Sequence, residues 1–597
     1  MRVLGSALLA CATVLVATGA LCPTTVFAAS FSVDIRGVDD RALRAELRDA
    51  LGSLPNPPGS RLEARRRAEE AGDKVIAVLR SEGYYDYDVA ADIGDGDAPQ
   101  PFVTVTLGPQ SKIAAPGVTW IGSPPPPDVV SLAIAAMALK PGDPGRAEAV
   151  IAAEGRIVAA LREHGYADAE TQPREVVVDH ADQTLQPTFR IAAGALVKLD
   201  GVKLAGSSRT RNAWVRWLAP WKPGQVFRPE DLAQLELRLR DTGAFDAVSV
   251  ALAPTGEEVG GLRPVVVTLV DRPKGTLELG GSYSTTEGAG VDSRWIVYNR
   301  FNRADTLTTS LEVAQIDSRL STELSLPDWR LPGQTLKLTV AGYNDDTDAY
   351  DSSGGVISAD ATRRFGKISF VTFGLSLDGS TTDEKESANY VHSGRQRTLI
   401  TPALLAAFSL DKSNDPLDPT EGWRVQARAE PTYAFGDGSI GYLKVSSQAS
   451  GYLPVGGLGT VIAARVNLGT ILGGDIPLVP APARFYAGGG GSVRGYGYQA
   501  VGPRYGDNTP SGGLSLFETS FEVRQHVTQK WSVVAFLDAG SVGLRVNPDF
   551  SHPELGVGVG VRYDLGFGPI RVDIATPLQQ REGDSVVQLY LSIGQAF

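Results

Sequence analysis

The chain is poor in cysteine, with only Cys11 and Cys22 among its 597 residues. Both lie in an N-terminal apolar stretch that begins after Arg2 and ends at the V-x-A sequence of residues 26–28. This layout predicts a secretory signal peptide over residues 1–28. The mature chain is then expected to contain no disulfide and no thiolate metal site. An uncleaved membrane anchor is the alternative interpretation of the same stretch.

Three further absences narrow the class of protein. After residue 28 there is no run of 18 apolar residues, so any membrane crossing must be made by a closed β-barrel. The net charge of -12 argues against nucleic acid as a partner. The five histidines are scattered, and neither an H-E-x-x-H nor a G-x-S-x-G motif occurs. We therefore expect neither an enzyme nor a protein that carries a metal or another cofactor.

Three similar units occupy the N-terminal part of the mature chain. In each one a helical segment ends at a glycine that an aromatic residue closely follows, at Gly83, Gly165 and Gly243. The glycines recur at intervals of about 80 residues, which indicates an array of small domains. A short strand precedes the helices and two strands close each unit. The sequence therefore predicts three β-α-α-β-β domains, at residues 30–108, 109–194 and 195–272.

The region of residues 275–597 has a different pattern. Helical periodicity is replaced by short segments of alternating polar and apolar residues, separated by polar turns such as residues 344–348. Such segments of about ten residues are typical of outer-membrane β-barrels, and at roughly 20 residues per strand and connection the region holds about 16 strands. The alternation continues to the terminal Phe597. The predicted fold class is α+β followed by all-β, with a C-terminal 16-stranded transmembrane β-barrel, and a large soluble β-sandwich is the alternative.

A glycine-rich segment with one central arginine lies late in the barrel region, at residues 484–505. Its four consecutive glycines precede Val493, Arg494, Gly495 and Tyr496. Glycine lets the backbone approach other structure closely. The segment lacks the strand, the GxxxxGK[ST] pattern and the helix of a phosphate-binding P-loop. We expect the arginine to face a particular partner instead of bulk water.

Strand alternation supplies candidate partners for this arginine. In two later segments the apolar residues take one phase while Glu522 and Asp538 take the other, which places both carboxylates in the lumen. Alternate glycines at residues 556–560 form a stripe on the inner face, and such a stripe indicates close approach by another backbone. We therefore predict that the loop enters the lumen, where Arg494 pairs with these carboxylates. Ordinary lumen charges that face water are the alternative.

These motifs resemble those of the outer-membrane barrel-assembly superfamily. The sequence RFYAGGGGSVRGY is similar to the conserved sixth-loop motif, and residues 536–540 and 566–571 are similar to later barrel motifs. The three N-terminal units resemble POTRA domains. Their number is similar to that of the TamA family, the barrel subunits of the translocation and assembly module. BamA-type proteins usually carry five such units and two-partner secretion transporters carry two.

The resemblance implies a function in the assembly of outer-membrane proteins. A barrel of this kind is expected to insert or translocate β-barrel or autotransporter proteins through a lateral seam between its first and last strands, with the POTRA-like units in the periplasm. The implied partners are a TamB-like periplasmic protein, unfolded clients and outer-membrane lipid. The alternative is a two-partner-secretion-type transporter that exports a large exoprotein through the lumen. The expected residues of the two seam strands are Leu277, Leu279, Gly281, Leu589, Leu591 and Phe597.

Overall fold

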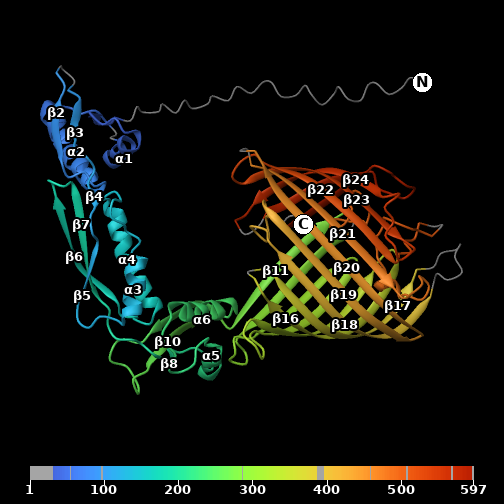
Figure 1. Cartoon of the computed structure of the whole chain (residues 1–597). Helices are drawn as coiled ribbons and strands as arrows, with labels where there is room; N and C mark the ends of the chain where they lie inside the picture. The colour runs from blue at the N-terminus through green and yellow to red at the C-terminus, as the bar shows by residue number, and fades with distance from the viewer. Residues whose placement is uncertain are drawn as a thin grey trace, which may run out of the picture. The chain divides into compact units, whose positions relative to one another are not determined.

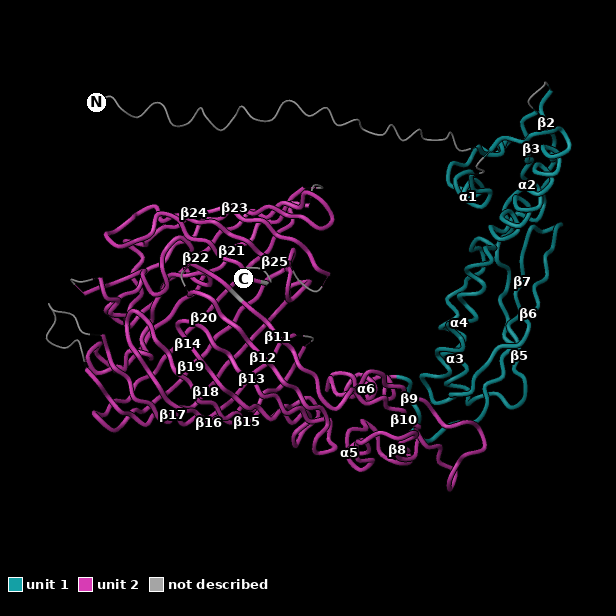
Figure 2. The backbone as a smooth tube through the Cα atoms, turned by 180° about the vertical axis from the view of Figure 1, so that it is seen from behind, with its two compact units in different colours: residues 1–198, 226–229 teal, residues 199–225, 230–597 magenta. Residues whose placement is uncertain are grey.

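The computed structural model describes residues 31–593, except for residues 54–55, 96–98, 286, 367, 386–394, 457–458, 506–507 and 567–568. The expected signal peptide of residues 1–28 and the seam residue Phe597 therefore lie outside the described residues. None of the helices among the described residues combines the length and the apolar composition of a membrane-spanning helix. The chain divides into two compact units, residues 1–198 with 226–229 and residues 199–225 with 230–597, which Figure 2 shows in different colours.

The first compact unit holds two of the expected small domains. In the first domain the parallel strand pair β1–β3 and the antiparallel pair β2–β3 form a sheet in the order β1-β3-β2. Two helices cover it, and Leu43, Leu47 and Val75 from these helices are buried against Val103 and Val105 of the sheet. The elements of this domain are β1 (Asp34–Arg36), α1 (Arg41–Leu51), α2 (Arg61–Ser81), β2 (Tyr87–Ile93) and β3 (Pro101–Leu107).

The second domain differs from the expected pattern in one detail. Its opening strand is split into two short strands, and both pair with β7 in parallel. Ile157 and Leu161 of a long helix pack with Phe189 of the central strand in the core. The elements are β4 (Lys112–Ile113), β5 (Gly117–Trp120), α3 (Pro127–Ala136), α4 (Ala147–Glu163), β6 (Glu170–Asp179) and β7 (Thr184–Ala192).

The third domain belongs to the same compact unit as the barrel. Its sheet has the order β8-β10-β9 and repeats the arrangement of the first domain. The elements are β8 (Leu199–Ala205), α5 (Asn212–Leu218), α6 (Pro229–Asp241), β9 (Phe245–Leu252) and β10 (Arg263–Asp271). The prediction of three β-α-α-β-β domains before the barrel is confirmed.

Sixteen antiparallel strands then close into a barrel, in which each strand pairs with its neighbours in sequence and the last pairs with the first (Figure 1). The predicted strand number is confirmed. The strands are β11 (Gly275–Ser284), β12 (Gly288–Tyr298), β13 (Thr306–Ala314), β14 (Asp317–Leu326), β15 (Gln334–Asp346), β16 (Tyr350–Arg364), β17 (Phe370–Glu384), β18 (Gln396–Asp411), β19 (Gly422–Gly436), β20 (Gly438–Val455), β21 (Thr460–Leu472), β22 (Ser515–His526), β23 (Trp531–Gly543), β24 (Glu554–Asp564), β25 (Pro569–Pro577) and β26 (Gln588–Ile593).

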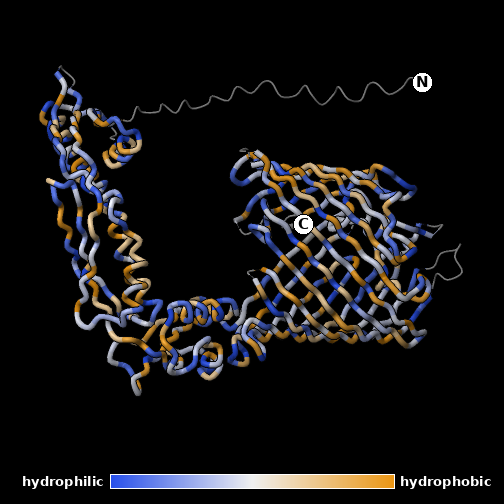
Figure 3. Tube along the Cα trace, in the orientation of Figure 1, coloured by the Kyte–Doolittle hydropathy of each residue, from blue (hydrophilic) through white to orange (hydrophobic). Residues whose placement is uncertain are grey.

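The outer face of the barrel is apolar. Successive residues of a strand point to opposite faces, and hydrophobic and hydrophilic residues alternate along the strands in Figure 3. Large exposed side chains such as Leu279, Val340 and Leu404 belong to the outer face, whereas charged residues such as Glu522 and Asp573 are buried within. A closed sheet with an apolar exterior satisfies its backbone polar groups without water, as the hydrocarbon layer requires.

Gly83, two residues after the end of α2, shapes the junction between the first two domains. Gly83 has a φ of 86°, and its carbonyl oxygen accepts the N–H of Ser111 at 2.9 Å. A Cβ at this position would lie 2.7 Å from the carbonyl oxygen of Gly145 in the second domain. Both the backbone conformation and the close approach of the two domains therefore require glycine here.

Replacing Gly83 tests this junction. We expect Gly83→Ala to destabilise a fragment of residues 30–198 by about 2 kcal/mol or more, because alanine meets both a left-handed backbone and a steric clash. Urea unfolding followed by circular dichroism measures the change. Gly155→Ala is the matched control: a Cβ at Gly155 in α4 meets no atom within 4 Å. That substitution should stabilise the fragment by about 0.5–1 kcal/mol, and equal effects of the two alanines would contradict the assignment.

Candidate functional site

The loop between β21 and β22 packs against the inner wall of the barrel. It spans residues 473–514, includes the short helix η1 (Ala481–Ala483), and is held to itself by the backbone bridges Phe485–Gly513 and Ala487–Val501. Val493 and Tyr496 at its tip are fully buried. The apolar cluster that contains them combines loop and wall residues: Ile471, Phe485, Val493, Tyr496, Val501, Leu516 and Val542.

Arg494 is the centre of a buried ionic network, with 2% of its surface exposed. Its guanidinium group donates in bidentate fashion to Asp538, with Nε 2.7 Å from Oδ2 and Nη2 2.9 Å from Oδ1. Nη1 lies 2.8 Å from Oε1 of Glu522 and 3.1 Å from Oδ2 of Asp573. The guanidinium also stacks 3.4 Å above the centroid of the Phe536 ring. Such planar, bidentate and stacked contacts suit arginine and not lysine.

Three more arginines of the wall surround the carboxylates. Arg524 lies 2.9 Å from Glu522, while Arg562 and Arg571 both pair with Asp573. Three neighbouring carboxylates repel one another, and a buried charge without a partner is costly. The positive charges of the wall arginines therefore offset the negative charges of the carboxylates that pair with Arg494. These residues come from β22, β23, β24 and β25, so the network joins the loop to four consecutive strands.

The same loop also contacts the last strand. The hydroxyl of Tyr590 on β26 accepts the N–H of Gly495 at 3.1 Å and donates to the carbonyl oxygen of Tyr496 at 3.3 Å. On the neighbouring wall, a Cβ at Gly556 of β24 would lie 1.9 Å from the carbonyl oxygen of Arg494. The glycine stripe thus lets the loop backbone lie directly on the strand.

A second ionic cluster fixes the start of the loop to a different part of the wall. Arg484 lies 2.9 Å from Glu384 of β17, and Arg397 of β18 pairs with the same carboxylate. Arg484 also donates to the carbonyl oxygens of Val479 and Ser511, which brings the two ends of the loop together. The loop is therefore attached both to β17–β18 and to β22–β25.

The junction between the first and last strands is short. Among the described residues, β11 and β26 are paired only at Tyr283–Leu591 and Ser284–Tyr590. The next shortest ladder within the described part of the chain, between β25 and β26, has six residue pairs. Thr285 adds side-chain hydrogen bonds to Gln588 and to the backbone of Leu589. The rest of β11 pairs with β12 alone within the described part of the chain.

Comparison with known proteins places this architecture in a family. Residues 299–597 match the Omp85 superfamily domain, and residues 32–109 match the POTRA domain described as TamA domain 1. The chain belongs to the Omp85 superfamily. Its superfamily and its closed barrel indicate the outer membrane, and its small N-terminal domains are POTRA-like.

Relatives of this Omp85 protein include assembly factors. It is 23% identical to the outer membrane protein assembly factor BamA of Neorickettsia risticii over 74% of this chain and 60% of the relative. It is 25% identical to BamA of Nitratidesulfovibrio vulgaris over 73% of this chain and 56% of the relative. The chain thus spans less than two thirds of these relatives.

The fold is also found among solved structures. BamA from Haemophilus ducreyi lacking POTRA domains 1-3 matches 80% of this chain and 99% of its own, with a TM-score of 0.69 and 17% identity. At that identity the likeness concerns the fold alone.

The structure brings most of the sequence-predicted residues together. Arg494 contacts Glu522 and Asp538, while Gly495 and Tyr496 next to it contact Tyr590 and Leu555. Leu277, Leu279 and Gly281 lie on the part of β11 that, among the described residues, pairs with β12 alone. Leu589 faces β25, and Leu591 pairs with both neighbours. Sequence reasoning missed these partners of the loop: Asp573, Ser520, Tyr590, Glu384 and Arg397. It also missed Arg562, which pairs with Asp573.

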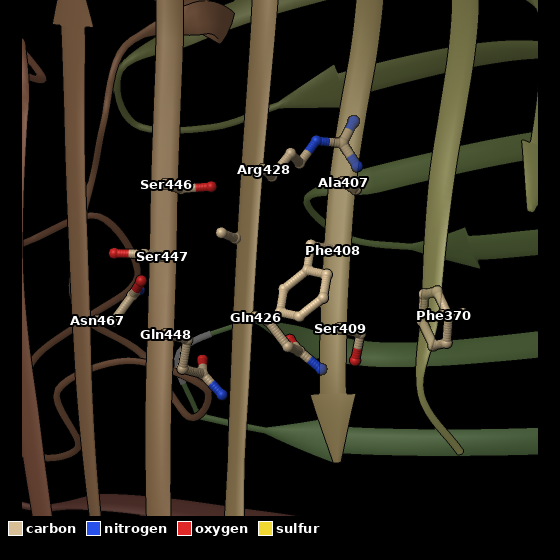
Figure 4. Close-up of a pocket in the computed structure, with 11 residues that line it drawn as sticks. Phe370, Ala407, Phe408, Ser409, Gln426, Arg428, Ser446, Ser447, Gln448 and Asn467 are labelled. Atoms are coloured by element: carbon tan, nitrogen blue, oxygen red, sulfur yellow. The ribbon is translucent and has the colours of Figure 1, made fainter. Parts of the chain in front are cut away.

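A separate hollow of about 300 Å³ lies in the wall formed by β17–β21 (Figure 4). Seven of its eleven lining residues are polar. Gln426, Gln448 and Asn467 lie at one level because they are register neighbours across β19, β20 and β21. Such amides suit a water-filled lumen. Among the described residues, no group of three or more histidine, cysteine or acidic side chains is arranged to hold a metal.

Replacing Gly556 tests whether the loop rests on the wall. The new methyl group of Gly556→Ala would overlap the Arg494 carbonyl, and overpacking of this kind costs about 1–3 kcal/mol. We therefore expect trypsin to cut the loop roughly tenfold faster in the intact outer membrane. Gly451→Ala on β20, where a Cβ meets nothing within 4 Å, should leave the rate unchanged. An unchanged rate in both variants would show that the loop does not depend on this contact.

Proposed function

We propose that this protein is an outer-membrane assembly factor that inserts or translocates β-barrel and autotransporter proteins through the β11–β26 seam. The observation that supports this proposal most directly is the short pairing of those two strands. An exposed strand edge is a template for another strand, as in β-augmentation. A client strand that pairs with β11 or β26 satisfies its own backbone groups as it enters the lipid.

The lumen loop stabilises the wall on one side of this seam. Its network fastens β22 to β25 from within, and Tyr590 extends the contact to β26. The seam then opens between β11 and β26 while the other strands keep their register. The alternative is export of an exoprotein through the lumen. The loop is attached to two parts of the wall inside the lumen, which supports the seam as the route over the lumen.

The finer assignment is to the TamA type. Three POTRA-like domains and the match of residues 32–109 to TamA domain 1 support it. The POTRA-like domains would then face the periplasm and bind a TamB-like partner or unfolded clients. The BamA relatives support the broader role in outer-membrane assembly.

A reversible lock across the seam tests the proposal. Tyr283 and Leu591 are register partners with outward side chains, and directly opposed residues have the spacing that a disulfide needs. We expect the pair Tyr283→Cys with Leu591→Cys to abolish surface display of an autotransporter client in a deletion strain. Reduction with dithiothreitol should restore it.

The control is a lock across a permanent junction. Leu311→Cys with Leu320→Cys joins register partners on β13 and β14 that also face outward. This variant should remain active when oxidised. Full activity of the oxidised seam variant would refute lateral opening while leaving the fold unaffected.

Loss of the central arginine tests the role of the loop. We expect Arg494→Ala to leave a folded barrel in the membrane but to reduce client display at least tenfold, since three buried carboxylates lose their shared partner. Charge reversal at Glu522 or Asp538 should have a similar effect. Arg428→Ala removes a half-exposed inner-wall arginine that pairs with Glu430, and it should be neutral. Heat-modifiable electrophoretic mobility measures folding separately, and complete complementation by Arg494→Ala would exclude the assigned role.

A further inference from the structure

A pocket lies where the third POTRA-like domain meets the barrel. It has a volume of about 440 Å³ and is bounded by α5 on one side and by the turn between β14 and β15 on the other. The backbone N–H of Arg211 donates to the carbonyl oxygen of Asn302, and Asn299 donates to Thr210, so the two sides are joined by hydrogen bonds. The residues that line the pocket are Arg211, Ala213, Trp214, Trp217, Arg303, Leu326, Pro327, Asp328, Trp329 and Arg330.

The pocket combines positive charge with tryptophan. The guanidinium groups of Arg211, Arg303 and Arg330 have no carboxylate partner within the described part of the chain, and all three residues are exposed. Asp328 is the single acidic residue of the lining, and it accepts the N–H of Gly333 at 2.7 Å. The lining therefore carries a net positive charge. Trp217 is 44% exposed, although a large aromatic surface usually seeks burial.

An apolar surface leads from this pocket along the barrel. Leu320, Leu324 and Leu326 share the outward face of β14, and Leu326 both ends this column and lines the pocket. The neighbouring strand adds Leu336 opposite Leu326 and Leu338 opposite Leu324. The pocket thus lies at the point where the hydrocarbon-facing surface gives way to polar turns. Tryptophan is enriched at this depth of a membrane.

We propose that this pocket binds the phosphate-bearing headgroup of a phospholipid from the adjoining leaflet. The three arginines would contact the phosphate, Trp217 and Trp329 would flank the glycerol region, and the acyl chains would lie on the apolar faces of β14 and β15. Basic pockets at this depth are suited to lipid headgroups. A bound lipid would connect α5 to the barrel rim and hold the third POTRA-like domain against the membrane surface. This assignment does not depend on the seam mechanism.

Native mass spectrometry of the full-length protein tests the proposal, with dioleoyl-phosphatidylglycerol as the added probe. We expect one lipid to remain bound at detergent concentrations that strip the others. In a variant with Arg211→Gln, Arg303→Gln and Arg330→Gln its affinity should fall about fivefold for each arginine removed. A fluorescence readout is independent: lipid with brominated acyl chains should quench tryptophan emission less in Trp217→Phe than in the native protein.

The control removes an exposed arginine from the opposite end of the barrel. Arg545→Gln lies in the connection between β23 and β24 and should retain the lipid. Unchanged lipid affinity in the triple variant, with its barrel still heat-modifiable, would overturn the proposal. An equal loss in Arg545→Gln would also overturn it, because the binding would then reflect the overall charge. If the protein retains free inorganic phosphate in place of lipid, the pocket is an anion site without a membrane role, and that result would also overturn the proposal.

Discussion

The constraint on which the rest of the structure depends is that lipid offers no hydrogen bonds to the backbone. A sheet in the hydrocarbon layer must therefore close, and every junction of this barrel is a ladder. Within the described residues, fifteen of these ladders have six or more paired positions each. The sixteenth consists, within the described residues, of two paired positions and the bonds of Thr285. The architecture of the lumen makes sense as a response to this one weak junction, since it reinforces the strands that lead up to it.

The reinforcement is electrostatic, and its members depend on one another. Arg494 cannot lose its proton, so its burial requires carboxylates nearby. Glu522, Asp538 and Asp573 meet that need, but their own proximity requires the wall arginines. Removal of any member leaves an uncompensated buried charge, which costs about 3–5 kcal/mol. A network of this kind tolerates little movement. It joins the four strands β22 to β25, and the last of these, β25, is the neighbour of β26.

Much of this arrangement could be predicted from strand alternation. The phase of each segment assigns Glu522 and Asp538 to the lumen, and the glycine stripe at residues 556–560 indicates that another backbone lies on it. Alternation also assigns Asp573 to the lumen, but it does not say at which height along the barrel a residue sits. Height depends on the stagger between strands, which places Asp573 opposite Gly560 and Tyr590 opposite Asp573. Sequence reasoning could not predict, for the same reason, where along β11 the pairing with β26 lies. It lies near Tyr283 and not near Leu277. Arg484 lies 100 positions from Glu384, and no local pattern connects the two residues.

For the function proposed above, the magnitudes support the seam over the lumen as the route for a client. Opening the lumen requires removal of the loop from two attachments, and each broken ion pair leaves buried charges at about 3–5 kcal/mol. Opening the seam requires the loss of a few hydrogen bonds, each worth about 1 kcal/mol net. In the proposed mechanism an arriving client strand would replace those hydrogen bonds one by one, whereas an unfolded client would not replace a bidentate arginine–carboxylate pair. Under the proposed function, the path of lowest cost would therefore run between β11 and β26, because the loop makes opening of the lumen more costly.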